Sequence, residues 1–441
     1  MKYPDDYINK IIQGDTKTVL KTIPDESVNC CVTSPPYWSL RDYGVEPVIW
    51  DGDKNCEHEW GNKRKIPKTT QWNTGGVFDP NNRKTVQEES YIGQFCLKCN
   101  AWRGSLGLEP TFELYIKHLC DIFDEVKRVL REDGTCWVNL GDSYSGGGRG
   151  WQGKNDYKKL NEKGVKSIKT NIPDKSLMLI PQRFAIEMVN RGWILRNTII
   201  WHKPNCMPSS AKDRFTVDFE YVYFFVKSKK YWFEQQFEKH LTIKEFQKRD
   251  MLKRKLNDSN KQYSKHSHGP NDYNPNGRNK RTVWTIPTQP FPEAHFAVYP
   301  EGLIEIPIKA GCPEFVCKKC GKARVKIYKG KSDNAFNIGA RDTKSGRFKE
   351  KWGSTQRTRP HYEKYKGDKE FAGEGKKFIG YTDCGCNAGF EGGIVLDPFM
   401  GAGTTALVAL KQRKRFIGIE IKQEYIDMAY KRIVKVQQKI F

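Results

Sequence analysis

The stretch GGIVLDPFMGAGTTALVALKQRKRFIGIE, residues 392–420, decides the fold of this 441-residue chain. An apolar run ends at Asp397, the glycines Gly401 and Gly403 follow, and a second apolar run ends at Glu420. This order predicts a strand, a tight loop, a helix and a second strand, which is the repeating unit of a doubly wound α/β sheet. Glycine lets the backbone turn sharply and approach a ligand, so we expect a cofactor loop between the first strand and the helix.

The loop does not follow the glycine order of a dinucleotide site. The pattern G-x-G-x-x-G lacks its third glycine here, and Thr404 and Thr405 occupy the start of the helix, which disfavours NAD. Glu420 ends the next strand, where a carboxylate can accept hydrogen bonds from both ribose hydroxyls of an adenosyl group. The alternative for this residue is a solvated acid at the end of a strand.

A second loop, TSPPYW at residues 33–38, also follows an apolar run. Two prolines stiffen it, so that the Ser34 hydroxyl and the backbone carbonyls point one way, while Tyr37 offers a flat aromatic face. A nucleobase fits this arrangement. The alternative for the motif taken alone is a plain Pro-Pro turn capped by aromatic residues.

Elsewhere the chain alternates between helix and strand patterns. Residues 7–43 predict a helix, a short strand and a loop, residues 111–142 a helix and a strand, and residues 177–228 a helix and two strands. The Gly- and Lys-rich segment 143–164 has no period, and we expect a mobile loop there.

The charge of the chain favours a polyanionic partner. Its 76 Lys and Arg against 52 Asp and Glu give a formal net charge of +24, which points first to nucleic acid. We expect no membrane span, because no apolar stretch is long enough, and no secretory signal, because an acidic pair interrupts the first residues. The expected location is therefore the cytoplasm, in association with the nucleoid.

In that compartment thiols stay reduced, so the thirteen cysteines are better explained by metal ligation and buried packing than by disulfides. Their spacing predicts two closed structural zinc sites, one formed by Cys56, His58, Cys96 and Cys99 and the other by Cys317, Cys320, Cys384 and Cys386. Cys312 is an alternative ligand of the second site. The remaining cysteines, in apolar or strand contexts, are expected to pack: Cys30, Cys31, Cys120, Cys136 and Cys206.

The two loops together resemble those of the DNA amino-methyltransferase superfamily, of the prokaryotic or phage kind. The catalytic loop precedes the cofactor loop, which places the chain in the permuted β group of that family. Gly14–Asp15 resembles the family's acidic loop near the cofactor adenine, and residues 201–208 (WHKPNCMP) resemble its later active-site strand. Residues 295–303 (HFAVYPEGL) look like the segment that packs over the methionine end of the cofactor.

The resemblance implies a Rossmann-like methyltransferase fold with a doubly wound mixed sheet and a target-recognition region, and the zinc-binding insertions fall outside it. Together with the cysteine spacing it divides the chain into a catalytic half (1–50 and 106–226), a cofactor-binding half (286–311 and 387–441), a zinc-binding insertion (51–105), a second, basic zinc-binding insertion (312–386) and a target-recognition region (227–285). The last region is basic and rich in aromatic residues, as phosphate and base contacts require.

By the same resemblance the chain transfers methyl from S-adenosyl-L-methionine to an exocyclic amino group of a base flipped out of duplex DNA. Ser34 Oγ and the Pro35 carbonyl would accept the two amino hydrogens, and the base would stack on Tyr37. The catalytic residues would be Ser34, Pro35, Pro36 and Tyr37. The residues around the cofactor would be Asp15, Thr33, Asp397, Pro398, Phe399, Gly401, Gly403, Thr404, Thr405 and Glu420.

Serine at position 34 favours N4 of cytosine over N6 of adenine, because family members with Ser-Pro-Pro-Tyr mostly methylate cytosine. C5-cytosine chemistry would need a cysteine nucleophile, which that family carries after a proline, and no Pro-Cys dipeptide occurs. An RNA or small-molecule methyltransferase and a zinc-dependent DNA-binding protein with a defunct methylation site are the rival functions. The resemblance also leaves room for a homodimer and for a cognate restriction endonuclease acting on the same site, and the recognised DNA sequence is not readable.

Overall fold

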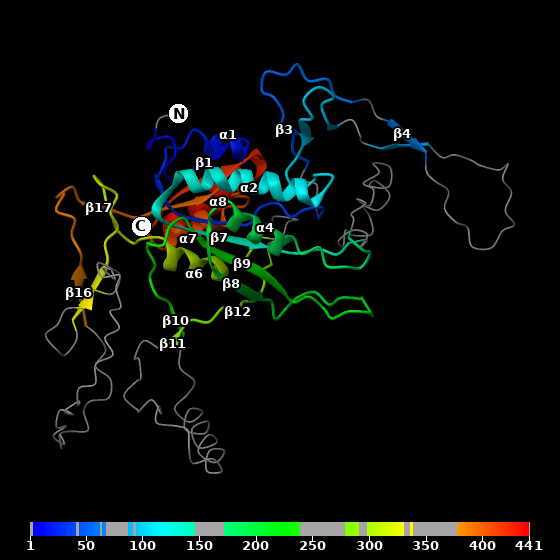
Figure 1. Ribbon diagram of the computed structural model, residues 1–441. Coiled ribbons are helices and arrows are strands. Elements are labelled where there is room, and N and C mark those ends of the chain that lie inside the picture. The colour runs from blue at the N-terminus through cyan, green and yellow to red at the C-terminus, as the bar shows by residue number, and fades with distance from the viewer. Residues whose placement is uncertain are drawn as a thin grey trace, which may run out of the picture.

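A computed structural model describes residues 3–40, 44–61, 64–67, 87–90, 94–145, 172–238, 278–290, 298–329, 336–337 and 377–440. At its centre is one eight-stranded sheet in the order β1-β19-β18-β2-β7-β9-β8-β12 (Figure 1). Its strands are β1 (Lys10–Gln13), β2 (Val28–Thr33), β7 (Leu130–Leu140), β8 (Ile194–His202), β9 (Phe219–Val226), β12 (Val283–Thr285), β18 (Ile394–Asp397) and β19 (Arg415–Glu420).

The sheet is mixed, because β9 alone runs against its neighbours β7 and β8. All other neighbouring pairs are parallel. The carboxyl ends of β2, β18 and β19 therefore meet at one edge, which is where open α/β sheets bind their ligands. The doubly wound mixed sheet predicted from the sequence is confirmed.

Helices cover both faces of this sheet (Figure 1). In β18 and β19 successive side chains alternate between two separate hydrophobic clusters, as the two-residue period of a strand requires. One cluster contains residues of α1 (Thr16–Leu20), α2 (Phe112–Val129) and α4 (Ile180–Asn190), and the other contains residues of α6 (Glu301–Gly311), α7 (Thr404–Lys411) and α8 (Gln423–Ile440).

Local sequence explains where these helices begin. The Thr111 hydroxyl accepts a hydrogen bond from the Leu114 backbone N–H, which caps α2. Acidic Glu113 lies in the first turn of α2, and Lys127 and Arg128 lie in the last, so the charges favour the helix dipole at both ends.

The expected helix near the N-terminus is wrong, because Lys10–Gln13 forms strand β1 beside β19. Ile11 packs into one hydrophobic cluster and Ile12 into the other, an arrangement that only a strand between two apolar layers provides. Helix α6 was not expected from the sequence, and it contains Pro307 in its interior.

The expected insertions form small antiparallel sheets outside the central one. Within the first insertion, β4 (Arg64–Pro67) pairs with β5 (Gln87–Ser90), and β6 (Trp102–Gly104) pairs with β3 (Val48–Trp50), which lies just before the insertion. Within the second, β14 (Lys326–Lys329) pairs with β15 (Phe336–Asn337) and β16 (Lys377–Tyr381), and β13 (Val316–Cys317) pairs with β17 (Phe390–Glu391), which lies just after the insertion.

The expected target-recognition region, 227–285, lies largely outside the described residues. The structure describes β10 (Phe237–Glu238) paired with β11 (Arg278–Asn279), and β12, which extends the central sheet. Most of the segment expected to be a mobile loop also falls outside the description, as do residues 295–297. Among the described helices, none is both long and apolar enough to cross a membrane.

Candidate active site

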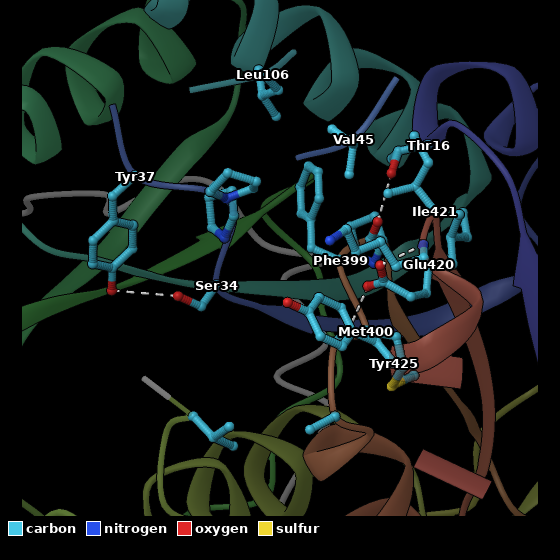
Figure 2. Close-up of a pocket in the computed structure, with 18 of the residues that line it drawn as sticks. Thr16, Ser34, Tyr37, Val45, Leu106, Phe399, Met400, Glu420, Ile421 and Tyr425 are labelled. Carbon is cyan, nitrogen blue, oxygen red and sulfur yellow. Dashed lines mark hydrogen bonds between the residues drawn. The ribbon is translucent and has the colours of Figure 1, made fainter. Parts of the chain in front are cut away.

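The two predicted loops line one cavity of ≈ 530 Å³ at the carboxyl edge of the sheet (Figure 2). Ser34 and Tyr37 lie at one end of the view, and Phe399 and Glu420 at the other. Ten of the residues predicted from the sequence line it: Asp15, Ser34, Pro35, Pro36, Tyr37, Pro398, Phe399, Gly401, Thr404 and Glu420.

Glu420 is held at the end of β19 by two backbone N–H groups. Its Oε2 accepts from Gly401 N and its Oε1 from Lys422 N, both at 2.9 Å. Burial raises the pKa of the Glu420 carboxyl. Each oxygen of a carboxylate can accept a further hydrogen bond, so Glu420 remains able to bind a vicinal pair of hydroxyls.

The glycines of the loop are required by its backbone. Gly403 has φ +77°, a conformation that favours glycine. A Cβ at this position would also lie 2.6 Å from the Cβ of Ala429 on α8. At Gly403 the loop therefore lies closer to α8 than a residue with a side chain would allow.

Asp397 lies behind the cavity and organises the residues that line it. Its fully buried carboxylate accepts hydrogen bonds from Thr33 Oγ1 (2.6 Å), Thr405 Oγ1 (2.6 Å), Phe399 N (3.0 Å) and the Tyr299 hydroxyl (3.0 Å). Burial raises the pKa of Asp397, although these donors act in the opposite direction. Of the predicted cofactor residues, Thr33, Asp397, Gly403 and Thr405 do not line the cavity, whereas Phe399 does. Tyr299, which was not among the predicted site residues, also lines it.

The N-terminal segment closes the cofactor end of the cavity. Asp15 caps α1, because its Oδ2 accepts from Thr18 N at 3.0 Å. The next residue, Thr16, donates from Oγ1 to the Pro398 carbonyl at 2.7 Å, a contact drawn in Figure 2. A segment from the N-terminal part of the sequence and one from the C-terminal part therefore meet at this site.

At the other end, Tyr37 belongs to a polar network that sequence reasoning missed. The Tyr37 hydroxyl donates to Glu220 Oε2 (2.8 Å), and Asn139 Nδ2 donates to the same oxygen (3.1 Å). Lys203 forms an ion pair with Glu220 Oε1. Burial, and then the charge of Glu220, raise the pKa of Tyr37 well above its ordinary value, so the phenol stays protonated.

Backbone contacts fix the same loop from outside the cavity. The Tyr115 hydroxyl of α2 donates to the Pro36 carbonyl at 2.8 Å. Gly141, just after β7, lies so close to the Tyr37 ring that a Cβ there would be 2.7 Å from Cε2. These contacts leave little freedom for the Tyr37 ring.

The residues that line this cavity fit S-adenosyl-L-methionine. Glu420 offers a carboxylate for the ribose diol, and Phe399 offers an aromatic face beside it (Figure 2). Thr16 lies at the same end of the cavity as Glu420, whereas Ser34 lies toward the other end (Figure 2). The cavity can thus hold an adenosyl group at one end and a base at the other.

Both predicted metal clusters converge in space. Within the described residues, the ligand atoms of each set of four lie within 4.8 Å of one another. In the first, Cys56 Sγ is 3.9 Å from Cys96 Sγ, and Cys99 Sγ is 3.4 Å from His58 Nδ1. Four soft ligands at such spacing fit a closed tetrahedral zinc site.

Cys312 is not part of the second cluster and is fully buried in the core. The expectation that Cys30, Cys31, Cys120 and Cys136 pack in the interior is confirmed, since all four are fully buried. Cys206 is only half-buried, in the loop after β8. The expected packing role is wrong for this residue, because the apolar strand ends before it.

Three residues of the Tyr37 network were not predicted, because their signals in the sequence are weak: Lys203, Glu220 and Asn139. Lys203 stood within the quoted segment WHKPNCMP, but nothing local marked it as the partner of Glu220. Glu220 and Asn139 belong to neighbouring strands, β9 and β7, whose register only the tertiary structure provides.

Comparisons with known proteins show the family of the chain. A family model described as DNA methylase matches residues 28–315 and 387–431. The Type II methyltransferase M.SmaI of Serratia marcescens is 28% identical over 430 residues, covering 97% of this chain and 91% of that protein. The Type II methyltransferase M.Cfr9I of Citrobacter freundii is 27% identical over 427 residues, covering 96% and 87%.

Two solved structures are similar at low sequence identity. PvuII DNA methyltransferase, described as cytosine-N4-specific, is 14% identical with a TM-score of 0.44, covering 98% of this chain and 93% of that one. A DNA modification methylase of Thermus thermophilus, in complex with S-adenosyl-L-methionine, is 16% identical with a TM-score of 0.41, covering 97% and 93%.

Proposed function

The chain belongs to the N6/N4 DNA methylase family, and from this premise we propose that it methylates N4 of cytosine in duplex DNA. It is a DNA methyltransferase, and S-adenosyl-L-methionine is its methyl donor. The observation that carries the proposal is the single cavity on which the Ser34–Tyr37 loop and the Pro398–Gly401 loop meet. The net charge of +24 supports a DNA substrate.

When bound, S-adenosyl-L-methionine supplies a methyl group already activated by the sulfonium, so the chain's residues need only bind, orient and move a proton. Ser34 Oγ and the Pro35 carbonyl accept the two amino hydrogens of the target base, which localises the nitrogen lone pair. Tyr37 stacks on the base, which has left the duplex because its amino nitrogen is unreachable inside the stack. Holding the nitrogen and the methyl group in line supplies much of the acceleration.

Ser34 favours cytosine over adenine. Asp-Pro-Pro-Tyr is the more usual loop for adenine N6, and this chain has Ser-Pro-Pro-Tyr. A neutral hydroxyl can accept an amino hydrogen from either base, so N6 of adenine is the second candidate with the same site.

We further propose that the enzyme is part of a restriction-modification system, as the names of its Type II relatives indicate for them. Both cysteine clusters are proposed to hold structural zinc. Each has four protein ligands and thus no open position for catalysis, and amino methylation needs no Lewis acid because the methyl group is already activated.

The test is to express the chain in cells, read the modified positions by long-read sequencing, and then methylate a duplex carrying that motif in vitro. Nucleoside mass spectrometry is expected to find N4-methylcytosine. N6-methyladenine would establish the second candidate instead. Transfer of methyl to RNA but not to duplex DNA would overturn the substrate class.

A further inference from the structure

A chain of hydrogen bonds with one direction connects Ser34 to Glu220. Ser34 Oγ donates to the Tyr37 hydroxyl at 3.3 Å, and the Tyr37 hydroxyl donates to Glu220 Oε2 at 2.8 Å. Because both hydroxyl hydrogens point toward Glu220, the lone pairs of Ser34 Oγ remain for an amino hydrogen from the cavity. Catalytic hydrogen bonds are often long before the substrate binds. The 3.3 Å bond between Ser34 and Tyr37 is therefore compatible with proton transfer along this chain.

Methylation of an amino nitrogen leaves one proton to remove. As the nitrogen lone pair forms the N–C bond and the C–S bond breaks, the nitrogen becomes positively charged and must lose one of its two hydrogens. Ser34 can pass such a proton on, but a hydroxyl that already carries its own hydrogen cannot keep it. Of the carboxylates that line the cavity, Glu220 is the one that accepts a hydrogen bond from the Tyr37 hydroxyl.

We propose that Glu220 is the final proton acceptor of the methyl transfer, reached through Ser34 and Tyr37; this inference rests on the proposed function. The amino proton moves to Ser34 Oγ as the Ser34 proton moves to Tyr37 and the Tyr37 proton moves to Glu220. The nitrogen keeps the electron pair of the broken N–H bond, and the sulfur keeps the pair of the broken C–S bond. Glu220 ends as a carboxylic acid, which returns its proton to water after the product leaves.

The surroundings of Glu220 suit this role. The side chains of Glu220 and its ion-pair partner Lys203 are each 19% exposed, so the carboxylate is largely screened from solvent and lies beside a cation. Asn139 donates to Glu220 Oε2 at 3.1 Å and to the Tyr221 carbonyl at 3.0 Å, which fixes the oxygen that faces Tyr37. The raised pKa of Tyr37 makes its phenol a carrier of the proton and not a base in its own right.

The competing role for Glu220 is to hold the Tyr37 ring in place without taking a proton. The two roles predict different results for Glu220→Gln, because glutamine keeps an oxygen that can accept from the Tyr37 hydroxyl but cannot take up a proton. A positioning role would leave this variant nearly active. A proton-acceptor role would disable it while the base still stacks.

The experiment measures single-turnover methyl transfer to a duplex carrying the motif found by sequencing. Glu220→Gln is expected to lower the rate constant about 10²- to 10⁴-fold, with KM for DNA within a few-fold of wild type. Fluorescence of 2-aminopurine placed next to the target base should show unchanged flipping. The residual rate should rise with pH, because solvent hydroxide must then remove the proton, while the wild-type rate stays flat over the same range.

Glu187→Gln is the matched control, since it removes a carboxylate that pairs with Arg191 on α4, outside the cavity. It should retain the wild-type rate and pH profile. Tyr37→Phe keeps the ring but cuts the relay, so it should resemble Glu220→Gln. The double variant that combines Tyr37→Phe with Glu220→Gln should be no slower than the slower of the two single variants, because both substitutions interrupt the same proton pathway.

A near-normal rate for Glu220→Gln would overturn the proposal. A rate that falls together with flipping, without a new pH dependence, would also overturn it and assign Glu220 to positioning. If the wild-type protein methylates no DNA, the proposed function itself fails, and that outcome is distinct because it needs no variant.

Discussion

At the scale of single residues, Tyr37 is held in position by contacts from three other elements. Glu220 of β9 binds its hydroxyl, Tyr115 of α2 binds the neighbouring Pro36 carbonyl, and Gly141 after β7 abuts its ring. A stacking platform for a flipped base works only if its plane is already fixed, because a small misplacement costs rate.

Gly141→Ala is therefore expected to lower methyl transfer by about 10²-fold. The new methyl group would lie 2.7 Å from Tyr37 Cε2 and displace the ring, while the affinity for S-adenosyl-L-methionine should stay within a few-fold. Gly302→Ala is the control, because the nearest heavy atom to its Cβ, Ile286 Cγ2, is at an ordinary 3.7 Å. Normal turnover of Gly141→Ala would show that the ring can shift without consequence.

The pKa of Glu420 gives cofactor binding a pH dependence. Burial raises this pKa, so the carboxyl takes up its proton at a higher pH than an ordinary glutamate. The ionised form accepts more hydrogen bonds from ribose hydroxyls, so affinity for S-adenosyl-L-methionine should fall as pH decreases from neutral.

Calorimetric titration with S-adenosyl-L-methionine, repeated at several pH values from neutral downward, measures this loss of affinity. Glu420→Gln should bind more weakly at neutral pH and lose most of the pH dependence. The pKa of Asp397 is raised as well, so a dependence that survives in Glu420→Gln would assign it to Asp397.

At the scale of elements, the first insertion is fastened to the catalytic domain through His118 of α2. The fully buried imidazole stacks between Trp50 and Trp102, with ring centroids at 4.6 and 5.5 Å. Its Nδ1 lies 3.1 Å from Glu109 Oε1 and its Nε2 lies 3.1 Å from Asp51 Oδ2. The cysteine cluster is thus linked by two strands, β3 and β6, to a helix that also contacts the catalytic loop.

Cys96→Ser is expected to lower the bound zinc from two ions per chain to one and to reduce thermal stability. Metal binding supplies folding free energy to an insertion whose sequence is polar, so DNA affinity should fall before the methyl-transfer step does. Elemental analysis and thermal unfolding measure both effects. Cys206→Ser is the matched control, because Cys206 belongs to neither cluster; a wild-type protein without zinc would refute both sites.

Helices and strands with strong local sequence patterns could be predicted. Elements and residues whose structure or role depends on tertiary contacts could not. Helix α2 carries a long periodic pattern, and strands β18 and β19 are apolar runs on either side of the glycine loop and its helix, so these elements were expected. Strand β1 has four residues whose apolar pair suits a helix equally well, and only the two flanking layers select a strand. Glu220 escaped prediction for the same reason, because its role depends on strand register.

At the scale of the whole molecule, the excess of positive charge should dominate DNA affinity. Neutralising phosphates releases counterions, so binding of a +24 chain is expected to weaken about 10³-fold between roughly 50 and 200 mM salt. Affinity for S-adenosyl-L-methionine should change far less. Fluorescence anisotropy at several salt concentrations measures the slope, and a slope near zero would show that the basic residues do not contact the phosphates.

The strand order has a consequence for how the enzyme is made. In the sheet, β18 and β19 lie between β1 and β2, and the backbone N–H of Ile394 binds the Asn29 side chain across 365 residues of sequence. On the ribosome, β2 can pair early with β7 on one side, but its other edge and β1 must wait until residues 394–420 emerge. Until then an apolar strand edge is open to aggregation, and the nascent protein has no complete cofactor cavity. We therefore expect the nascent chain to depend on chaperones and to mature slowly, because the cofactor cavity is complete only after β18 and β19 have emerged.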